Sequence, residues 1–346
     1  MNPHPFGLHR SLDPPGCLPQ LARRLDATPR ARENEIAVSV RALSIDSASF
    51  RQLRETESAT GESVRDQIGR IVRDRGKMQN PVTGSGGMLL GEVAEVGPRH
   101  PAARVLMKGD RIASLVSLTL TPLHLEEIGA IHVQTERVEA VGTAILFERT
   151  LWAALPADFP EGVALAAFDV AGAPATVLRD AKPGATVVVV GTGKAGLLCL
   201  AAARETVGGK GKVFAVEPSR EAAERARSLG FADAVFSIDA RDPVAMLSAV
   251  EGATAGKLAD LVVNVANASG TEAASVLCAR DDGAVLFFGM ATSFSAAALG
   301  AEGLAKPTAL RIGNGYVPGH AETALALLRR HPALSKAFAA LAGPSR

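Results

Sequence analysis

The sequence has few cysteines and no long hydrophobic run, and each shortage excludes a class of protein. Its three cysteines, Cys17, Cys199 and Cys278, are odd in number, lie far apart and form no CxxC pair. These features argue against a disulfide framework and a four-cysteine zinc lobe. No stretch reaches the roughly 18 consecutive apolar residues of a membrane span, and the first residues lack the apolar core of a signal peptide. We therefore expect a protein of the reducing cytoplasm without a membrane partner.

The sequence also lacks an excess of either positive or negative charge. The chain has 37 Lys and Arg against 36 Asp and Glu, interspersed, for a net charge of +1. This balance argues against a basic surface for nucleic acid and against a polybasic membrane patch. Apolar residues make up 47% of the sequence, which is enough for full-sized cores. The length of 346 residues corresponds to two domains at about 100–200 residues each.

Residues 1–160 have the pattern of a β-rich domain. The segment "EIAVSVRALSID" (35–46) alternates apolar and polar residues, as a half-buried strand does. Residues 51–77 are charged and weakly helical. Further strands are predicted in "GGMLLGEVAEVG", in the apolar segment "LVSLTLTPL" and in "AILFE", separated by glycine turns. Short strands at this spacing favour a small barrel or sandwich.

Residues 161–346 alternate between strand and helix. "ATVVVVG" is a continuous apolar run, typical of a strand buried on both faces, and "KAGLLCLAAARETVG" after it is helical. The strand and helix patterns then repeat through "KVFAVE", "DAVFSI", "ADLVVNVA", "GAVLFFGM" and "TALRIGNGYV". This order predicts an α/β domain with a doubly wound parallel sheet.

A glycine-rich loop lies between the first strand and helix of that domain. Gly191, Gly193 and Gly196 form G-x-G-x-x-G, which permits a tight turn, close approach of a pyrophosphate, and close packing of helix on strand. The first turn of the helix supplies free N–H groups. The predicted dinucleotide site comprises Gly191, Thr192, Gly193, Lys194, Ala195 and Gly196.

An acidic residue is expected about 20 residues further on, at the end of the next strand. Glu217 ends "KVFAVE", 21 residues after Gly196. Its carboxylate can accept hydrogen bonds from ribose hydroxyls and would repel a 2′-phosphate, so the prediction is NAD rather than NADP. Arg220 leaves the alternative open, because an arginine here can neutralise a phosphate.

Ligands of such sheets bind beyond the carboxyl ends of the strands. That rule selects Asn264 after "LVV", and Phe288 and Gly289 after "VLF", as residues beside the nicotinamide. Ordinary turns at strand ends are the alternative interpretation of these positions.

A β-rich half followed by a nucleotide-binding half resembles the medium-chain dehydrogenase/reductase superfamily, as do "GEVAEVG" and "RIGNGYVPGHAETALALL". The resemblance implies a GroES-like β-rich barrel domain, a Rossmann domain and a homodimer. Zinc members of the superfamily carry ligands in the stretches that correspond here to "SIDSASF", "GSGGMLLG" and "AFDVAGAP". None of the three contains Cys or His. Because catalytic zinc normally needs three protein ligands, we expect no metal.

The unusual segments resemble those of the 3,5-diaminohexanoate dehydrogenase family. They are "PFGLHR", "IDSASF", "RGKMQNPVTGSGGMLLG", "FDVAGAPA" and "DARDPV". This resemblance implies NAD-dependent oxidative deamination of L-erythro-3,5-diaminohexanoate to 5-amino-3-oxohexanoate and ammonia in lysine fermentation. The substrate would be a small zwitterionic amino acid with two ammonium groups and one carboxylate.

Matching charges to that substrate selects candidate residues. Asp46 or Glu148 would act as the base, Asp169 would pair with an ammonium group, and Ser47 would hydrogen-bond substrate or water. Arg10 or Lys77 would bind the carboxylate.

Two alternative functions remain open. One is a zinc-free, NADPH-dependent quinone or enoyl reductase of the same superfamily. The other is a nucleotide-binding protein that has lost catalysis, because an intact glycine loop is compatible with either.

Overall fold

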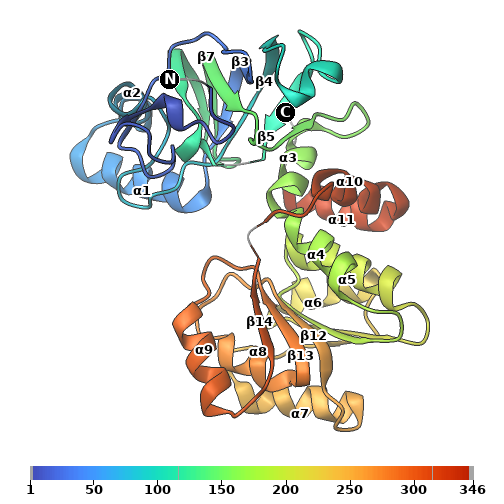
Figure 1. Cartoon of the computed structure of the whole chain (residues 1–346). Coiled ribbons are helices and arrows are strands. Elements are labelled where there is room, and N and C mark those ends of the chain that lie inside the picture. The colour runs from blue at the N-terminus through green and yellow to red at the C-terminus, as the bar shows by residue number, and fades with distance from the viewer. Residues whose placement is uncertain (1–2, 116, 314, 343–346) are drawn as a thin grey trace. The chain divides into compact units, whose positions relative to one another are not determined.

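The chain divides into two compact units, residues 1–157 and 158–346, which are described separately. The computed structural model describes residues 3–115, 117–313 and 315–342 (Figure 1). Val116 and Asn314, which fall within two of the segments quoted above, lie outside the described residues.

Unit 1 is built on a six-stranded sheet with the order β6-β7-β3-β4-β5-β8, in which every neighbouring pair is antiparallel. Its strands are β3 (Glu35–Ser44), β4 (Met88–Val96), β5 (Arg111–Ser114), β6 (Leu123–His132), β7 (Arg137–Phe147) and β8 (Trp152–Ala154). The sheet order is open, with β6 and β8 at its edges. The predicted strand in "LVSLTLTPL" is wrong over 118–120, where a 3₁₀ turn, η3 (Leu118–Leu120), precedes β6.

Two helices follow β3, where the sequence predicted weak helix. They are α1 (Ser47–Thr60) and α2 (Val64–Arg75). Asp46 caps α1 through the main-chain N–H of Ser49, and Ser63 caps α2 through that of Asp66. Leu53, Ile68 and Val72 of these helices pack into the core of the sheet. The amino-terminal segment adds η1 (Leu8–Arg10), β1 (Ser11–Asp13) and β2 (Arg24–Leu25), and η2 (Pro101–Arg104) follows β4.

Unit 2 contains the predicted parallel sheet, in the order β11-β10-β9-β12-β13-β14. This is the strand order 3-2-1-4-5-6 of a doubly wound dinucleotide-binding domain. The strands are β9 (Thr186–Val190), β10 (Lys212–Val216), β11 (Ala234–Phe236), β12 (Ala259–Asn264), β13 (Ala279–Phe287) and β14 (Ala309–Ile312). Strands β9, β10 and β12 are buried along almost their whole length, as their apolar runs predict.

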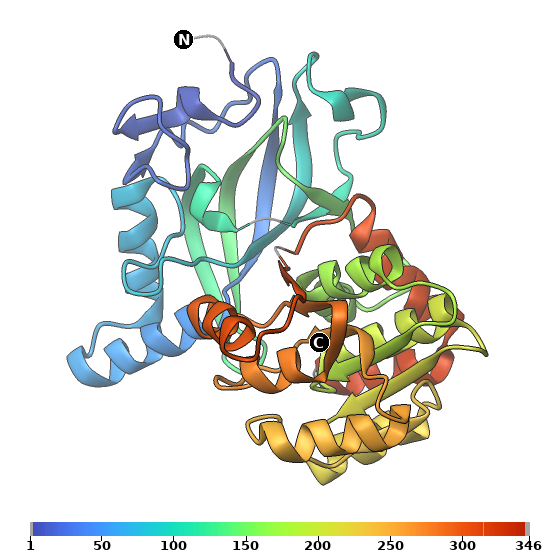
Figure 2. The same ribbon diagram turned by 60° about the horizontal axis from the view of Figure 1, so that its bottom comes forward.

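Two groups of helices cover the faces of that sheet (Figures 1 and 2). One group is α7 (Pro243–Thr254), α8 (Glu272–Cys278) and α9 (Phe294–Gly303), whose apolar side chains share a core with alternate strand residues. The other includes α3 (Glu161–Val170), α4 (Gly172–Asp180), α5 (Lys194–Val207), α10 (His320–Arg330) and α11 (Pro332–Ala342). Helix α6 (Arg220–Ser228) connects β10 to β11.

Among the described residues, no single helix is long and apolar enough to cross a membrane. Helices α3 and α4 meet the criteria of length and composition only as a pair, bent by 50° at their junction. Most of their apolar residues are buried in unit 2.

Candidate nucleotide site and acidic site

The glycine loop after β9 has the geometry that a pyrophosphate requires. Gly191 has φ +92°, a conformation that side chains disfavour. A Cβ on Gly196 would collide with the carbonyl oxygen of Gly191, so only glycine lets α5 pack this closely on the turn. A Cβ on Gly193 would meet no atom within 4 Å, so the space beside this residue is open to a ligand. The tight turn at Gly191 and the close packing at Gly196 follow the sequence pattern, and the role of Gly193 in pyrophosphate binding stays a prediction.

Helix α5 begins in this loop with its first turn uncapped by a side chain. Gly193 is the N-cap, and Lys194 and Ala195 follow it. The first N–H groups of a helix have no partner inside the helix, and they carry its positive dipole end. These N–H groups lie next to the open space at Gly193, as the predicted pyrophosphate site requires.

Glu217 lies directly after β10 and is hydrogen-bonded to the loop. Its Oε2 accepts from the main-chain nitrogen of Thr192 at 2.9 Å and from the Thr192 hydroxyl at 3.0 Å. Its Oε1 accepts from the main-chain nitrogen of Ser219 at 3.0 Å. The carboxylate therefore fixes the loop and places negative charge at the end of β10. Arg220 points elsewhere: its side chain is 91% exposed and pairs with Glu224 at 3.0 Å.

The carboxyl ends of β12 and β13 are shaped by Asn264. This fully buried amide donates to Thr271 Oγ1 at 2.8 Å and to Ser275 Oγ at 2.9 Å, and it accepts from the Ala266 nitrogen at 3.1 Å. All three bonds are internal, so Asn264 shapes the turn and does not present its amide to a ligand. Phe288 and Gly289 follow β13, and Phe288 donates its main-chain N–H to the Asn264 carbonyl.

In unit 1, the segment "NPVTGSGGM" packs against the start of α1. The hydroxyls of Ser49 and Thr83 are 2.6 Å apart. Asn80 is fully buried; it donates to Gln52 Oε1 at 2.7 Å and accepts from the nitrogens of Val82 and Thr83. Asn80 therefore folds the loop and attaches it to α1.

Glycines allow this loop to come close to the end of β3. Gly87 has φ +94°, and a Cβ there would lie 2.9 Å from the main-chain nitrogen of Asp46 and would clash with the Ser44 carbonyl. The main chain of this loop therefore lies directly beside the end of β3.

Asp46 lies at this junction with one carboxylate oxygen unused. Oδ1 accepts from the Ser49 nitrogen at 3.0 Å, whereas Oδ2 is buried and has no hydrogen-bond partner among the described residues. A buried acceptor without a partner is costly, and an ammonium group would satisfy it. Ser47 is nearby in sequence, but its hydroxyl donates to Glu136 at 2.6 Å.

The structure does not bring Glu148 or Arg10 to Asp46. Strand β7 is antiparallel to β3, so its last residue, Phe147, pairs with Glu35 at the start of β3. Asp46 follows the other end of β3, which places Glu148 on the order of 30 Å from it at about 3.3 Å per residue. Glu148 accepts a hydrogen bond from Asn34 at 3.2 Å. The two acids predicted as alternative bases therefore belong to two different places.

Arg10 and Lys77 hold the amino-terminal segment. The Arg10 guanidinium, 1% exposed, donates twice to Glu35, at 2.9 and 2.6 Å, and also to the carbonyls of residues 26, 28 and 30. The fully buried Lys77 ammonium donates to the carbonyls of Pro19 and Gln20. Both cations are buried and already hydrogen-bonded to groups of the protein. The geometry therefore gives no support to the prediction that one of them binds the substrate carboxylate.

Asp169 lies on the exposed side of α3 in unit 2. It and Asp46 are the only acids in the three stretches that correspond to zinc-ligand positions. Within the described part of the chain, no group of three or more His, Cys, Asp or Glu side chains could hold a metal ion. These residues do not fit zinc.

Comparison with known proteins identifies the relatives of this chain. Residues 9–156 match the family model of the L-erythro-3,5-diaminohexanoate dehydrogenase N-terminal domain. The L-erythro-3,5-diaminohexanoate dehydrogenase of Acetoanaerobium sticklandii is 43% identical over 334 residues, covering 96% of this chain and 97% of that protein. The enzyme of that name from Fusobacterium nucleatum is 45% identical over 336 residues, with the same coverage. The chain belongs to the L-erythro-3,5-diaminohexanoate dehydrogenase family.

The fold of this family member is that of the wider dehydrogenase group. Residues 195–308 match the zinc-binding dehydrogenase family model. An alcohol dehydrogenase from Thermotoga maritima superposes with a TM-score of 0.55 at 18% identity, covering 90% of this chain and 86% of that chain. The predicted α/β class, with a parallel Rossmann-like sheet and an antiparallel β domain, is thus confirmed.

Asp46, Ser49, Asn80 and Thr83 are joined by hydrogen bonds, and we call them the acidic site. Ser49, Asn80 and Thr83 were not among the residues predicted from the sequence. All three lie in "SIDSASF" or "NPVTGSGGM", the segments that carried the resemblance. Their roles could not be assigned from sequence, because the contact between them joins residues about thirty positions apart.

Proposed function

We propose that this chain catalyses the NAD-dependent oxidative deamination of L-erythro-3,5-diaminohexanoate to 5-amino-3-oxohexanoate and ammonia, without zinc. The observation that carries the proposal is the 43–45% identity over 96% of the chain to two enzymes of that name. The balanced reaction consumes the ammonium form of the substrate, one NAD⁺ and one water. It yields the ketone, NADH, an ammonium ion and one proton.

The chemistry of an amine explains how a dehydrogenase fold can work with a site that does not fit zinc. An alcohol must lose a proton of pKa about 16 as its hydride leaves, and a metal ion makes that loss feasible. An alkylammonium has a pKa of about 10.4, so a carboxylate base can deprotonate it at modest cost. The nitrogen lone pair then assists departure of the hydride, and a nicotinamide held at the glycine loop would supply the hydride acceptor. Water adds to the resulting iminium carbon and ammonia leaves.

Asp46 is our candidate for the group that binds and deprotonates the reacting ammonium. Its buried Oδ2 lacks a partner, and its Oδ1 is fixed by the Ser49 nitrogen. That Asp169 of α3 pairs with a substrate ammonium group stays a prediction from the sequence. Ser47, hydrogen-bonded to Glu136, has at most a supporting role.

Glu217 supports NAD as the cofactor. The fold is that of a nucleotide-dependent dehydrogenase, and the carboxylate at the end of β10 would repel a 2′-phosphate. Arg220, the residue that could neutralise such a phosphate, is paired with Glu224.

Two further assignments belong to the proposal. Strand β14 is a short edge strand with exposed Ile312, and pairing with a second copy would cover its free edge; we therefore propose a homodimer. All three cysteines are free thiols, which suits the reducing cytoplasm.

The test is to incubate the chelator-treated protein with NAD and racemic 3,5-diaminohexanoate, following reduced nicotinamide and ammonia together. We expect equal amounts of both, unchanged by the chelator. Reduction of a quinone or enone by NADPH without amine turnover would instead favour the reductase alternative. Nucleotide binding without turnover of any of these substrates would favour the non-catalytic one.

A further inference from the structure

Glu272 of unit 2 is an acidic side chain buried in the fold. It is the first residue of α8 and is only 3% exposed. Among the described residues it forms no ion pair, and the one hydrogen bond to its carboxylate comes from the main-chain nitrogen of Ser293, at 2.7 Å to Oε1. The second carboxylate oxygen has no partner in this part of the chain.

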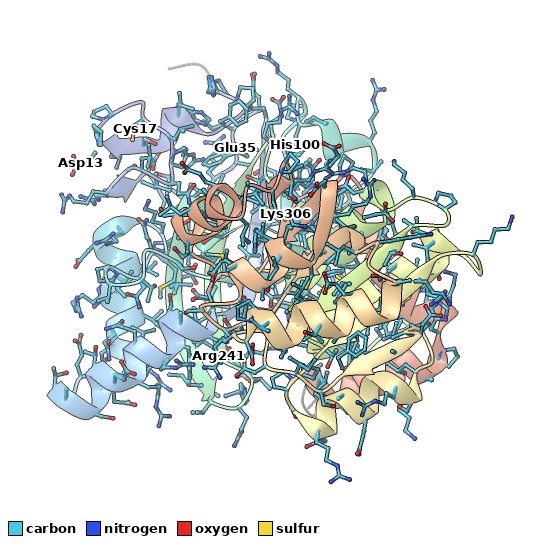
Figure 3. All side chains as sticks on the ribbon, turned by 90° about the horizontal axis from the view of Figure 1, so that it is seen from below. Asp13, Cys17, Glu35, His100, Arg241 and Lys306 are labelled. Atoms are coloured by element: carbon cyan, nitrogen blue, oxygen red, sulfur yellow. The ribbon has the colours of Figure 1, made fainter. Side chains whose placement is uncertain are left out.

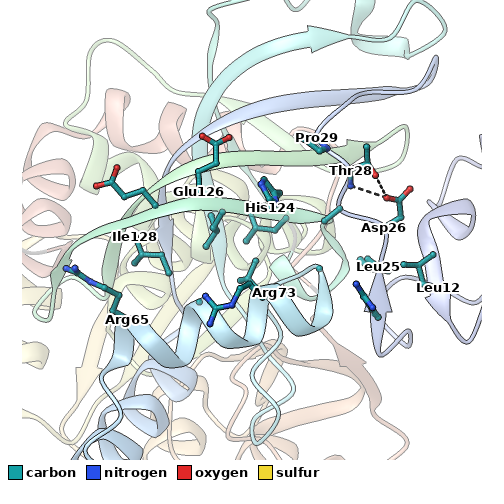
Figure 4. Close-up of a pocket in the computed structure, with 18 of the residues that line it drawn as sticks. Leu12, Leu25, Asp26, Thr28, Pro29, Arg65, Arg73, His124, Glu126 and Ile128 are labelled. Atoms are coloured by element: carbon teal, nitrogen blue, oxygen red, sulfur yellow. Dashed lines mark hydrogen bonds between the residues drawn. The ribbon is translucent and has the colours of Figure 1, made fainter.

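A buried carboxylate of this kind is energetically costly. Removal of the charge from water must be offset by a cation or by several hydrogen-bond donors. Exposed charges, such as Arg73 and Glu126 in the groove between α2 and β6 of unit 1, are solvated by water instead (Figure 4). The other buried acid of the described chain is Glu35, and it pairs with Arg10. Glu272 differs from Glu35 in having no counter-ion.

Glu272 lies between two chain segments that leave the sheet at its carboxyl edge. One is the loop 265–271, which connects β12 to α8. The other is the loop 288–293 between β13 and α9, whose last residue, Ser293, donates to Glu272. The two loops also touch near their starts, because a Cβ on Gly289 would clash with the Ala266 carbonyl oxygen. Helix α8 itself packs on β12 and β13 (Figure 1).

This edge of the sheet is where the nicotinamide half of a dinucleotide is expected. A doubly wound domain consists of two mononucleotide-binding halves, and β12, β13 and β14 form the second half. The nicotinamide ring carries a positive charge in NAD⁺ and none in NADH, whereas the pyrophosphate is the same in both. A carboxylate inside the protein at this edge would therefore attract the ring of the oxidised form only.

We propose that the nicotinamide cation is the counter-ion of Glu272, and that this residue sets the preference between oxidised and reduced cofactor. This role rests on the proposed use of NAD and is independent of the amine substrate. The charge of Glu272 raises the affinity for NAD⁺ relative to NADH. NAD⁺ then competes effectively with the NADH that the reaction forms.

The test is to titrate NAD⁺ and NADH calorimetrically into the full chain, as wild type and as E272Q. Glutamine keeps an acceptor for the Ser293 N–H and removes the charge. We expect the ratio of the Kd for NAD⁺ to the Kd for NADH to rise about threefold or more in E272Q. A general disturbance of the site would weaken both nucleotides alike and would leave this ratio unchanged.

Three further variants separate charge from packing. E272M is a second neutral variant of similar volume and should raise the ratio as E272Q does. E272D keeps the charge but shortens the side chain, so the ratio should stay near that of wild type. D260N is the matched control, because Asp260 accepts from the Thr186 nitrogen at 2.8 Å at the amino edge of the same sheet; its ratio should equal that of wild type. Thermal unfolding identifies any variant that does not fold.

The outcomes distinguish this role from the proposed reaction. An unchanged ratio in the folded neutral variants, or an equal rise in D260N, overturns the role of Glu272. A wild type that binds neither nucleotide overturns it as well. If the ratios change as expected but the wild type does not deaminate 3,5-diaminohexanoate, the proposed reaction is wrong and the role of Glu272 stands.

Discussion

Glu217 and Thr192 are joined by two hydrogen bonds to a single carboxylate oxygen, at 2.9 and 3.0 Å. The pair fixes the glycine loop to the end of β10, so the residue proposed to select the cofactor also sets the shape of its site.

Glu217→Gln should alter cofactor preference. The amide keeps an acceptor for Thr192 but removes the charge that repels a 2′-phosphate, so the ratio of kcat/KM for NADP to that for NAD should rise about tenfold or more. Steady-state kinetics with both nucleotides measure it. Glu221→Gln, at an exposed acid of α6, should leave the ratio unchanged. An unaltered ratio in the Glu217 variant would remove the argument for NAD.

Two glycines of the loop should respond differently to alanine. Gly193→Ala should fold normally but bind NAD at least tenfold more weakly, because its Cβ projects into the space assigned to the pyrophosphate. Gly196→Ala should lower the melting temperature, because its Cβ collides with the Gly191 carbonyl. Thermal unfolding and nucleotide titration distinguish the two. Gly209→Ala, in open space, is the control for both.

Asp46→Asn should remove activity without unfolding the protein. Asparagine caps helices about as well as aspartate, so α1 should persist. Loss of the base should lower kcat/KM by about 100-fold or more, with NAD binding retained. Asp242→Asn replaces an equivalent cap on α7 and should retain full activity. Near-normal turnover in the Asp46 variant would exclude Asp46 as the base.

Glu35 should make unit 1 sensitive to acid (Figure 3 labels this residue). Burial alone would raise the pKa of this carboxyl, but hydrogen bonds from His9 and Arg10 outweigh it and lower the pKa to about 2. Because this folded pKa is below the ordinary value of 4.5, the stabilisation is fully present above about pH 5 and is lost as the pH falls toward 2.

Glu35→Gln should therefore destabilise the protein at neutral pH by roughly 3 kcal/mol, since it leaves the Arg10 cation buried and unpaired. The difference from wild type should shrink below pH 4. Denaturant unfolding from pH 7 to pH 3 measures it; a difference that does not change with pH would contradict the assignment.

Lys77 should also make stability rise with pH, but in the alkaline range. Burial lowers the pKa of its ammonium to about 8, with a contribution from Arg75. The folded state therefore releases this proton before the unfolded state does, and stability gains from this group between about pH 8 and 10.5. In Lys77→Met this gain should be absent, so the stability of wild type relative to the variant should rise over that interval. Urea unfolding at pH 7.5 and pH 9.5 compares the two, and a constant difference would refute the shift.

The sequence by itself determined the features that are local. The glycine loop, the strand before it, the helix after it and the acid at Glu217 all lie within 32 residues, and their spacing is enough to predict their geometry. The lack of zinc ligands in three segments was likewise visible without coordinates. Buried parallel strands were predicted because each is a continuous apolar run.

Only the tertiary structure decided which distant side chains meet. Asp46 and Glu148 both follow strands, but the antiparallel register of β3 with β7 places them at opposite ends of the sheet. Arg10 and Lys77 were predicted to bind the substrate carboxylate on the basis of their charge alone. In the structure, Arg10 pairs with Glu35, and Lys77 donates to main-chain carbonyls of the amino-terminal segment. The loop at 80–87 reaches Ser49 through contacts that no local pattern encodes, because the free energy of a fold depends on which residues become neighbours, whatever their separation along the chain.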